Sequence, residues 1–289
     1  MVTTNKHEIR VYGIKRSGNH AIIYWIFKHF NGAVVHLNNV GLTPDPDPYK
    51  SFALMSVKGM SFWKCKPKIT SFLKYQINQP TKMIFVRVDP KVNIEYIRAY
   101  RPKECLILSF ENKIFDSSSE NLCLSNRDYS AYVGESERVV NIVILRDAYN
   151  LFASLLKSKM MRSKNCSKFV NLFKQYARIH LGESSTFPDP TICINYNQWC
   201  VDNNYRVDVA NKIGFNTSGS PFLEVEHFGG GSSFDKLAAR RNPQKLQNTA
   251  YRWRSFIDDP LYRSIFQDEE LRYLSTQVFG NYDEIQVTL

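Results

Sequence analysis

A basic loop near the N-terminus carries residues whose types and spacing suit the binding of an anion. Two glycines, Gly13 and Gly18, bracket it, and two cations, Lys15 and Arg16, lie between them. A β-rich segment precedes the first glycine, and an apolar helical segment begins near Asn19. In a strand, loop and helix of this kind the loop N–H groups and the helix dipole converge on one point. The sequence therefore predicts a phosphate-binding loop.

The end of this loop differs from that of nucleoside triphosphate P-loops. Those loops continue with Lys and then Ser or Thr, which reach the outer phosphates and hold magnesium. Asn19 and His20 occupy these positions here. We therefore expect a phosphate cradle without the usual groups for ATP and Mg²⁺. The alternative is a plain strand-to-helix turn in which glycine supplies a positive φ.

A second pair of residues follows a later apolar segment. Arg146 comes directly after 139–145, and Ser154 lies eight residues further on. A nearly continuous apolar run is typical of a strand buried in a parallel sheet, and ligands bind beyond the carboxyl ends of such strands. Arg146 would give a phosphate charge-assisted bonds and Ser154 a hydroxyl donor. Alternatively, Arg146 pairs with Asp147 and Ser154 is a small packing residue; Asp147 is also suited to cap the next helix.

Alternating strands and helices must position these groups. Strand patterns are predicted at 8–13, 33–37, 82–88, 104–111, 139–145 and 191–197. Helical patterns are predicted from about 19, at 149–159, 169–180 and 198–213, where Gly214 ends the helix, and from 236 to 279. The order predicts a three-layer α/β fold of P-loop nucleotide-binding type, with a mostly parallel central sheet and helices on both faces. We expect one domain over 1–289, with irregular insertions at 44–80 and 112–138 that frame the substrate site.

Composition narrows the class of protein. The net charge of +11 indicates an anionic partner, such as a nucleotide, a sulfated or phosphorylated substrate, a membrane surface or nucleic acid. No recognisable RNA-binding motif is present, so nucleic acid is not expected. The six cysteines are scattered without a C-x-x-C pair, which indicates reduced core residues rather than a metal site or a disulfide scaffold. No run approaches the ~18 to 20 apolar residues of a membrane span, so a soluble, cytoplasmic protein is expected.

The segment 143–154 resembles the 3′-phosphate motif of sulfotransferases that use 3′-phosphoadenosine-5′-phosphosulfate (PAPS), whose Arg and Ser are also eight residues apart. The segment 13–20 is similar to the 5′-phosphosulfate loop of that family. In the family this loop has a basic residue, Ser and Gly, followed by two threonines. The corresponding residues here, which the resemblance assigns to donor binding, are Lys15, Arg16, Ser17, Gly18, Asn19 and His20.

Two later segments agree with the same family in their order along the chain. Tyr196 resembles its adenine-contacting tyrosine, and the segment 232–234 resembles a Thr-Ser-Phe segment whose ring lies against adenine. The residues of that segment are Ser232, Ser233 and Phe234. The family's Arg-Lys-Gly motif has no clean match, and Arg252 or the pair at 240–241 is the candidate replacement. Together the four segments span about residues 8–255.

The resemblance implies an enzyme that moves a sulfuryl group from PAPS to a hydroxyl or amine of an unknown acceptor. A glycan or a small anionic metabolite would suit the basic, aromatic insertions. PAP is released, and no metal is expected. Negative charge grows on the leaving oxygen, where Arg16, or else Lys15, would stabilise it.

The acceptor also requires a general base. Glu111 at the end of the strand 104–111 is the first candidate, His20 the second and His36 the third; as an alternative, Glu111 is a solvated loop carboxylate. Two other functions stay open: a non-catalytic relative that binds PAP or another nucleotide, and a P-loop kinase acting on a small metabolite.

Overall fold

The computed structural model of the chain describes residues 4–60, 83–87, 94–114, 128–184, 187, 190–217 and 248–281. These residues contain a seven-stranded sheet in the order β4-β3-β2-β5-β1-β6-β7. The strands are β1 (Asn5–Gly13), β2 (Val34–Asn38), β3 (Leu54–Lys58), β4 (Met83–Arg87), β5 (Lys103–Glu111), β6 (Ser136–Leu145) and β7 (Thr191–Asn195). Strands β2, β5, β1, β6 and β7 run parallel, and β3 and β4 add antiparallel at one edge. The predicted mostly parallel sheet is confirmed.

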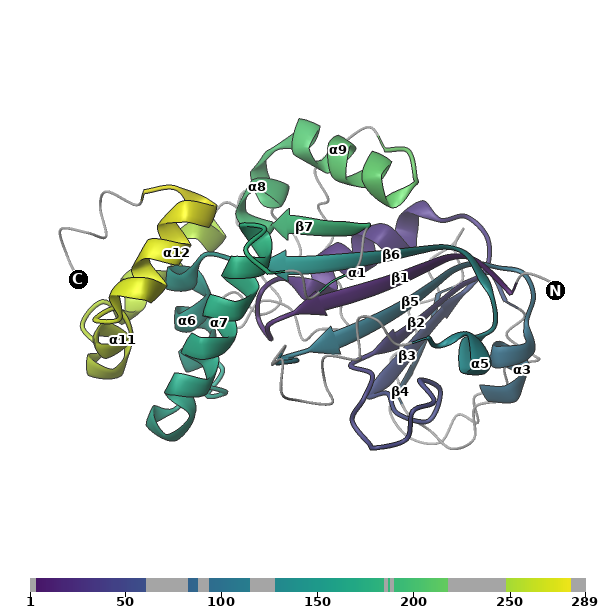
Figure 1. The fold of residues 1–289 in the computed structure, drawn as a ribbon, viewed down its shortest axis with the longest axis horizontal. Coiled ribbons are helices and arrows are strands. Elements are labelled where there is room, and N and C mark those ends of the chain that lie inside the picture. The colour runs from purple at the N-terminus through teal and green to yellow at the C-terminus, as the bar shows by residue number, and fades with distance from the viewer. Residues whose placement is uncertain are drawn as a thin grey trace.

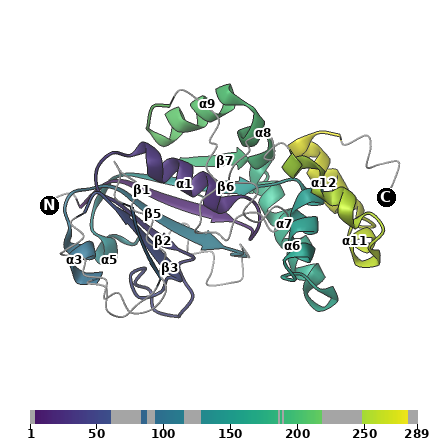
Figure 2. The ribbon, with the colours of Figure 1, turned by 180° about the vertical axis from the view of Figure 1, so that it is seen from behind.

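Helices cover both faces of this sheet (Figures 1 and 2). They are α1 (Asn19–His29), α3 (Ile94–Ala99), α5 (Ser130–Val133), α6 (Ala148–Lys157), α7 (Cys166–His180), α8 (Tyr196–Val201), α9 (Asn203–Ile213), α11 (Pro260–Ile265) and α12 (Glu269–Phe279), with the 3-10 helices η2 (Ser163–Asn165) and η4 (Asn248–Phe256). Helices α1, α8 and α9 pack on one face, and α7 packs on the other. Among the described residues, no helix is long and apolar enough to cross a membrane.

The central strand β1 divides the core into two layers because successive side chains of a strand point to opposite faces. Ile9 and Val11 pack with Ile22 and Ile26 of α1, whereas Tyr12 belongs to the layer under α7. β1 lies between β5 and β6 over its whole length. The segments that follow these three strands therefore leave the sheet at the same edge, where α6 and α12 gather (Figure 1).

Two segments expected to be irregular contain regular structure. Residues 54–58 form β3, although no strand was predicted within 49–80, because a five-residue strand with two polar residues gives too weak a pattern. Within 112–138, α5 forms and β6 begins at Ser136 rather than at 139. The polar start of β6 is partly exposed beside β1, where Ser136 is opposite Asn5. Because the first residues of β6 are not apolar, the sequence pattern did not indicate that they belong to the strand.

The predicted helix 198–213 is two helices. Asp202 interrupts it, because its carboxylate caps a new helix by accepting from the N–H groups of Asn204 and Tyr205. The preceding strand also ends earlier than predicted, so that Tyr196 is the first residue of α8. The predicted C-cap at Gly214 is confirmed by its left-handed φ of 107°.

Candidate functional site

The two predicted phosphate-binding segments meet at the carboxyl edge of the sheet. Gly13 at the end of β1 is opposite Ile144 in β6, so the loop after β1 and the start of α6 are neighbours. The Arg16 Nε–H donates to the Ser154 Oγ at 3.1 Å, although the two residues are 138 positions apart. Ser154 is buried. The structure thus brings together the loop and the Arg-Ser pair.

The loop is held in a tight turn by its own residues. The carbonyl of Ile14 accepts hydrogen bonds from the Ser17 N–H and from the Asn19 Nδ2, both at 3.1 Å. Gly18 has a φ of 93°, which favours glycine, and Arg16 has a φ of 76° although it is not glycine. As placed, the Asn19 amide bonds the loop backbone, and a phosphate contact by this residue stays a prediction.

Ser17 has the feature expected of a ligand-binding hydroxyl. Its side chain is fully buried in the loop, and its Oγ has no hydrogen-bond partner among the described residues. A buried hydroxyl without a partner costs about 1 to 3 kcal/mol, so such groups usually find one. An oxygen of a bound anion would accept from it, and the loop therefore fits the phosphosulfate end of PAPS.

Positive charge accumulates beside the loop. Burial, followed by the nearby charge of Arg146, lowers the pKa of the Arg16 guanidinium from its ordinary value. Arg146 is only 4% exposed; its Nε lies 4.0 Å from the Asp147 Oδ2 and its Cζ 5.7 Å above the Tyr196 ring. The charges of Arg146 and Arg252 both act on the Tyr196 hydroxyl. Three guanidinium groups thus surround one small region.

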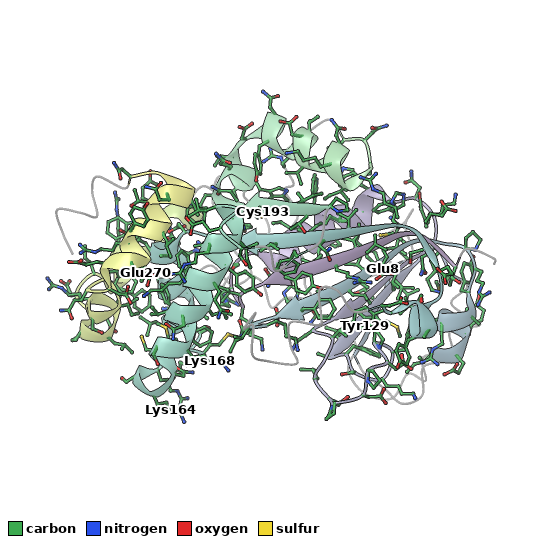
Figure 3. The ribbon with its side chains drawn as sticks, in the orientation of Figure 1. Glu8, Tyr129, Lys164, Lys168, Cys193 and Glu270 are labelled. Carbon is green, nitrogen blue, oxygen red and sulfur yellow. The ribbon has the colours of Figure 1, made fainter. Side chains whose placement is uncertain are left out.

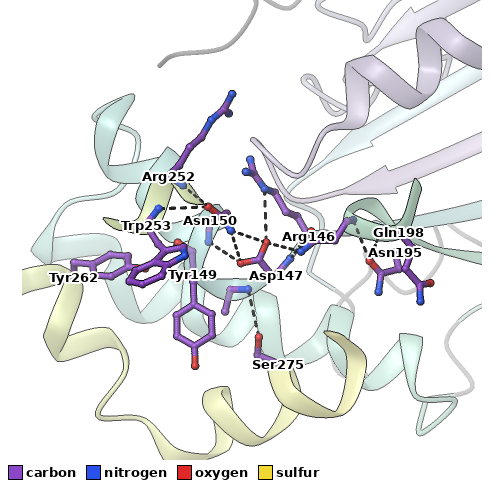
Figure 4. A network of polar contacts seen from close by, with 12 residues as sticks. Arg146, Asp147, Tyr149, Asn150, Asn195, Gln198, Arg252, Trp253, Tyr262 and Ser275 are labelled. Carbon is purple, nitrogen blue, oxygen red and sulfur yellow. Dashed lines mark hydrogen bonds and ion pairs between the residues drawn. The ribbon is translucent and has the colours of Figure 1, made fainter. Parts of the chain in front are cut away.

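A network around Asp147 fixes this arrangement (Figure 4). The Asp147 carboxylate caps α6 by accepting from the Asn150 N–H at 2.8 Å, as the sequence predicted. It also accepts from the side-chain amides of Asn150 and Asn197. The Asn150 Oδ1 in turn accepts from the backbone N–H groups of Arg252 at 2.9 Å and Trp253 at 3.4 Å. Asn150 thereby ties the segment that carries Arg252 to the start of α6.

Tyr196 is packed beneath the loop rather than open to solvent. A Cβ added to Gly18 would lie 2.1 Å from the Tyr196 ring, so only glycine allows this close approach. Trp199 also stacks on this ring, with 5.9 Å between the ring centroids. The predicted contact of Tyr196 with adenine is untested, but its position next to the loop and Arg146 is established.

The first candidate base, Glu111, lies beside the loop in an ion pair. Its Oε2 is 3.7 Å from the Lys15 Nζ. The next residue, Asn112, accepts from the Lys15 N–H at 2.8 Å and donates its own N–H to the Gly13 carbonyl at 3.1 Å. The end of β5 therefore supports the loop as well as supplying a carboxylate.

The second candidate base, His20, is held by a chain of hydrogen bonds. The Ser109 hydroxyl donates to the Asn38 Oδ1 at 3.0 Å and receives the Asn39 N–H at 3.1 Å. Because a carbonyl oxygen only accepts, the His20 Nε2 must carry a proton in its 3.3 Å contact with the same Asn38 Oδ1. A neutral His20 in this contact therefore has its lone pair on Nδ1.

The third candidate, His36, lies at the inner end of this chain. Its Nε2 is 3.1 Å from the Ser109 Oγ, and the side chain is 2% exposed. Burial, and then the charge of His20, lower the pKa of His36 to about 3. A buried, neutral His36 suits a structural role in holding Ser109.

Some predicted site residues fall outside the described part of the chain. These are Ser232, Ser233 and Phe234, the pair at 240–241, and residues 61–80 and 115–127 of the two predicted insertions. Among the described residues, no three His, Cys, Asp or Glu side chains gather as a metal site would require.

Four asparagines of the site were missed from the sequence. Asn38, Asn112, Asn150 and Asn197 bond groups on other elements, and a short polar side chain gives no periodic signal. Asn38 and Asn112 had a usable cue, because each follows directly on the end of a predicted strand.

Comparisons with known proteins add little. No family model matches the chain, and no curated protein matches it. Among solved structures, the fold is similar to that of the sulfotransferase domain of the Synechococcus PCC 7002 olefin synthase, with a TM-score of 0.45 and 13% identity over 95% of each chain. A likeness at this level says nothing about the reaction, which must follow from the residues of the site.

Proposed function

We propose that this protein is a sulfotransferase that uses PAPS as its donor. The observation that carries the proposal is the direct contact between the Arg16 Nε and the Ser154 Oγ. This contact joins the glycine loop after β1 to the Arg-Ser pair that follows β6, the neighbouring strand in the sheet. One nucleotide with phosphate groups at both ends would require the two segments to lie this close. The buried Ser17 hydroxyl and the charge of Arg146 further support an anionic ligand.

In this proposal the chain's own residues bind the donor and stabilise the negative charge that develops during the transfer. Ser17, the loop N–H groups and Lys15 hold the 5′ end, and Arg146 and Ser154 hold the 3′-phosphate. Arg252, tied to α6 through Asn150, adds positive charge beside them. Arg16 stands between the two ends and stabilises the charge that develops on the leaving oxygen.

The reaction forms one bond and breaks another. The acceptor oxygen or nitrogen bonds to sulfur, the bond from sulfur to the bridging phosphate oxygen breaks, and PAP leaves with the bond's electron pair. PAPS supplies the activated sulfuryl group. The acceptor proton passes to a base, for which the geometry favours His20, since Asn38 fixes its protonated nitrogen while Glu111 is paired with Lys15.

The donor is tested by thermal denaturation with PAP, with ATP plus Mg²⁺ and with ATP alone. A ligand that binds only the folded state raises the melting temperature in proportion to the logarithm of its concentration over Kd. We expect stabilisation by PAP without metal, and its loss in Arg146→Ala and Ser154→Ala. Release of PAP from PAPS, with water as a slow acceptor, then tests the chemistry without knowledge of the natural acceptor.

Each opposite result has a distinct meaning. Stronger stabilisation by ATP with Mg²⁺ than by PAP would replace the sulfotransferase with a kinase. Binding of PAP without any release of PAP from PAPS, in wild type as in Arg16→Ala, would leave a nucleotide-binding protein without catalysis.

A further inference from the structure

The turn between α6 and α7 is exposed and strongly basic. We call residues 158–168 the basic turn; its four exposed cations are Lys159, Arg162, Lys164 and Lys168. Figure 3 labels Lys164 and Lys168 at an outer extremity of the molecule, away from the sheet. The cations are therefore presented on a convex end rather than inside a site.

These cations lack acidic neighbours. The sequence has no Asp or Glu anywhere within 148–182. Lys174 and Arg178, further along α7, pair with carboxylates at the start of α12. Within the part of the chain that the structure describes, by contrast, no ion pair involves the four cations of the basic turn. No acidic residue of the described part of the chain therefore neutralises their charge.

The turn is held in a defined shape. The N–H groups of Met160 and Met161 both donate to the Leu155 carbonyl, and the Asn165 Nδ2 donates to the Met160 carbonyl at 3.0 Å. Met161 is buried at 2% exposure and anchors the turn, whereas its neighbour Met160 is 41% exposed. An apolar side chain thus lies on the surface among the cations.

Helix stability does not explain the two cations nearest to α7. Lys168 lies in the first turn of α7 and Lys164 just before it, where the positive end of the helix dipole disfavours cations. Like charges so close together also repel. A sequence shaped by stability alone would place acidic residues here, so the cations indicate a partner of opposite charge.

We propose that the basic turn docks on an anionic lipid bilayer. A convex end cannot enclose a small anion, but it can approach a flat charged surface. Each Lys or Arg near such a surface contributes roughly 1 kcal/mol, or about fivefold in binding. The exposed Met160 adds apolar contact that lipid, unlike a purely charged polymer, can accommodate.

The test measures cosedimentation with vesicles of phosphatidylcholine containing about one third phosphatidylserine, at roughly 0.1 M salt. The variant carries Lys159→Gln, Arg162→Gln, Lys164→Gln and Lys168→Gln, and should lose binding by roughly several hundredfold. The control has the same net charge but changes exposed cations elsewhere: Lys6→Gln, Lys212→Gln, Arg263→Gln and Arg272→Gln. We expect the control to bind within about threefold of wild type. The basic-turn variant should melt at a temperature no lower than the control, because its cations do not favour the start of α7.

Four results would overturn the proposal. Equal loss in both variants would mean that net charge alone drives binding. Equal binding to pure phosphatidylcholine would exclude anionic lipid as the partner. Retention on heparin that depends on the basic turn, with no vesicle binding, would assign the surface to an acidic polymer. Met160→Ser should weaken vesicle binding and leave heparin retention unchanged, and the reverse pattern would also contradict lipid docking.

Discussion

Arg16 holds a backbone conformation that is unfavourable for any residue with a side chain. Its φ of 76° lies in the left-handed region, which costs about 1 to 2 kcal/mol for an L-residue. Glycine would avoid this cost, yet the loop has arginine at this position. Strain retained at a ligand site suggests that the side chain is needed for function rather than for folding.

This strain gives a prediction that separates binding from stability. Arg16→Gly and Arg16→Ala remove the same guanidinium, so both should weaken PAP binding by about tenfold to a hundredfold, as expected for a charge-assisted hydrogen bond. Arg16→Gly should nevertheless be more stable than Arg16→Ala by about 0.5 to 1 kcal/mol, because only glycine relieves the backbone. Calorimetric titration and urea denaturation measure the two effects.

The opposite order of stability would show that residue 16 is not left-handed in solution. Unchanged PAP affinity in both variants would remove the guanidinium from the binding site.

His36 makes the stability of the fold depend on pH. The unfolded residue binds a proton near pH 6.5, whereas burial lowers the pKa of the folded residue to about 3. Below the unfolded pKa the unfolded state therefore binds more protons, and stability falls as the pH falls. Between about pH 7 and pH 5 the loss from this group should be on the order of 2 kcal/mol.

Urea denaturation of His36→Gln at the two pH values measures this term. The variant should be less stable at neutral pH, but its free energy of unfolding should fall less toward pH 5. Val35→Ala, an adjacent buried position on β2 without a titrating group, should keep the wild-type slope. If His36→Gln and Val35→Ala have the same slope, His36 is not the source of the effect.

At the scale of elements, α6 organises the site because the residues that contact Arg146 and the η4 backbone both lie at its first turn. Asp147 caps the helix and lies beside Arg146, and Asn150 binds the backbone of η4. The position of the Arg252 backbone therefore depends on the buried side chain of Asn150.

Asn150→Ala tests this dependence. It leaves the buried N–H of Trp253 and the neighbouring N–H of Arg252 without their acceptor, so the free energy of unfolding should fall by about 1 to 3 kcal/mol. PAP affinity should fall as well, because Arg252 is no longer held near Arg146. In a double-mutant cycle with Arg252→Ala, the two losses of affinity should not add.

Asn197→Ala is the matched control, because Asn197 also donates to Asp147 but does not bind the Arg252 backbone. We expect it to retain more PAP affinity than Asn150→Ala. Additive losses in the cycle would mean that Asn150 affects PAP affinity independently of Arg252.

At the scale of the molecule, the sequence predicted the type and order of the elements better than the side-chain hydrogen bonds between them. Apolar runs and glycine positions predicted that the loop at 13–18 and the pair Arg146 and Ser154 would follow parallel strands at one edge of the sheet, although not that these two strands are neighbours. Their direct contact depends on register, which the sequence left open. The side chains of Asn38 and Asn150 accept hydrogen bonds from residues about 70 and 100 positions away. No local sequence pattern could indicate these distant partners.

The stack of Gly18, Tyr196 and Trp199 has a practical consequence. The indole of Trp199 stacks on the Tyr196 ring, which lies against Gly18 of the loop at 13–18. Trp25 meets the Trp199 indole edge-on, with 5.7 Å between the ring centroids. A change in the loop when a ligand arrives would alter the surroundings of these two fluorophores. The intrinsic emission of the unlabelled protein thus offers an optical readout of occupancy.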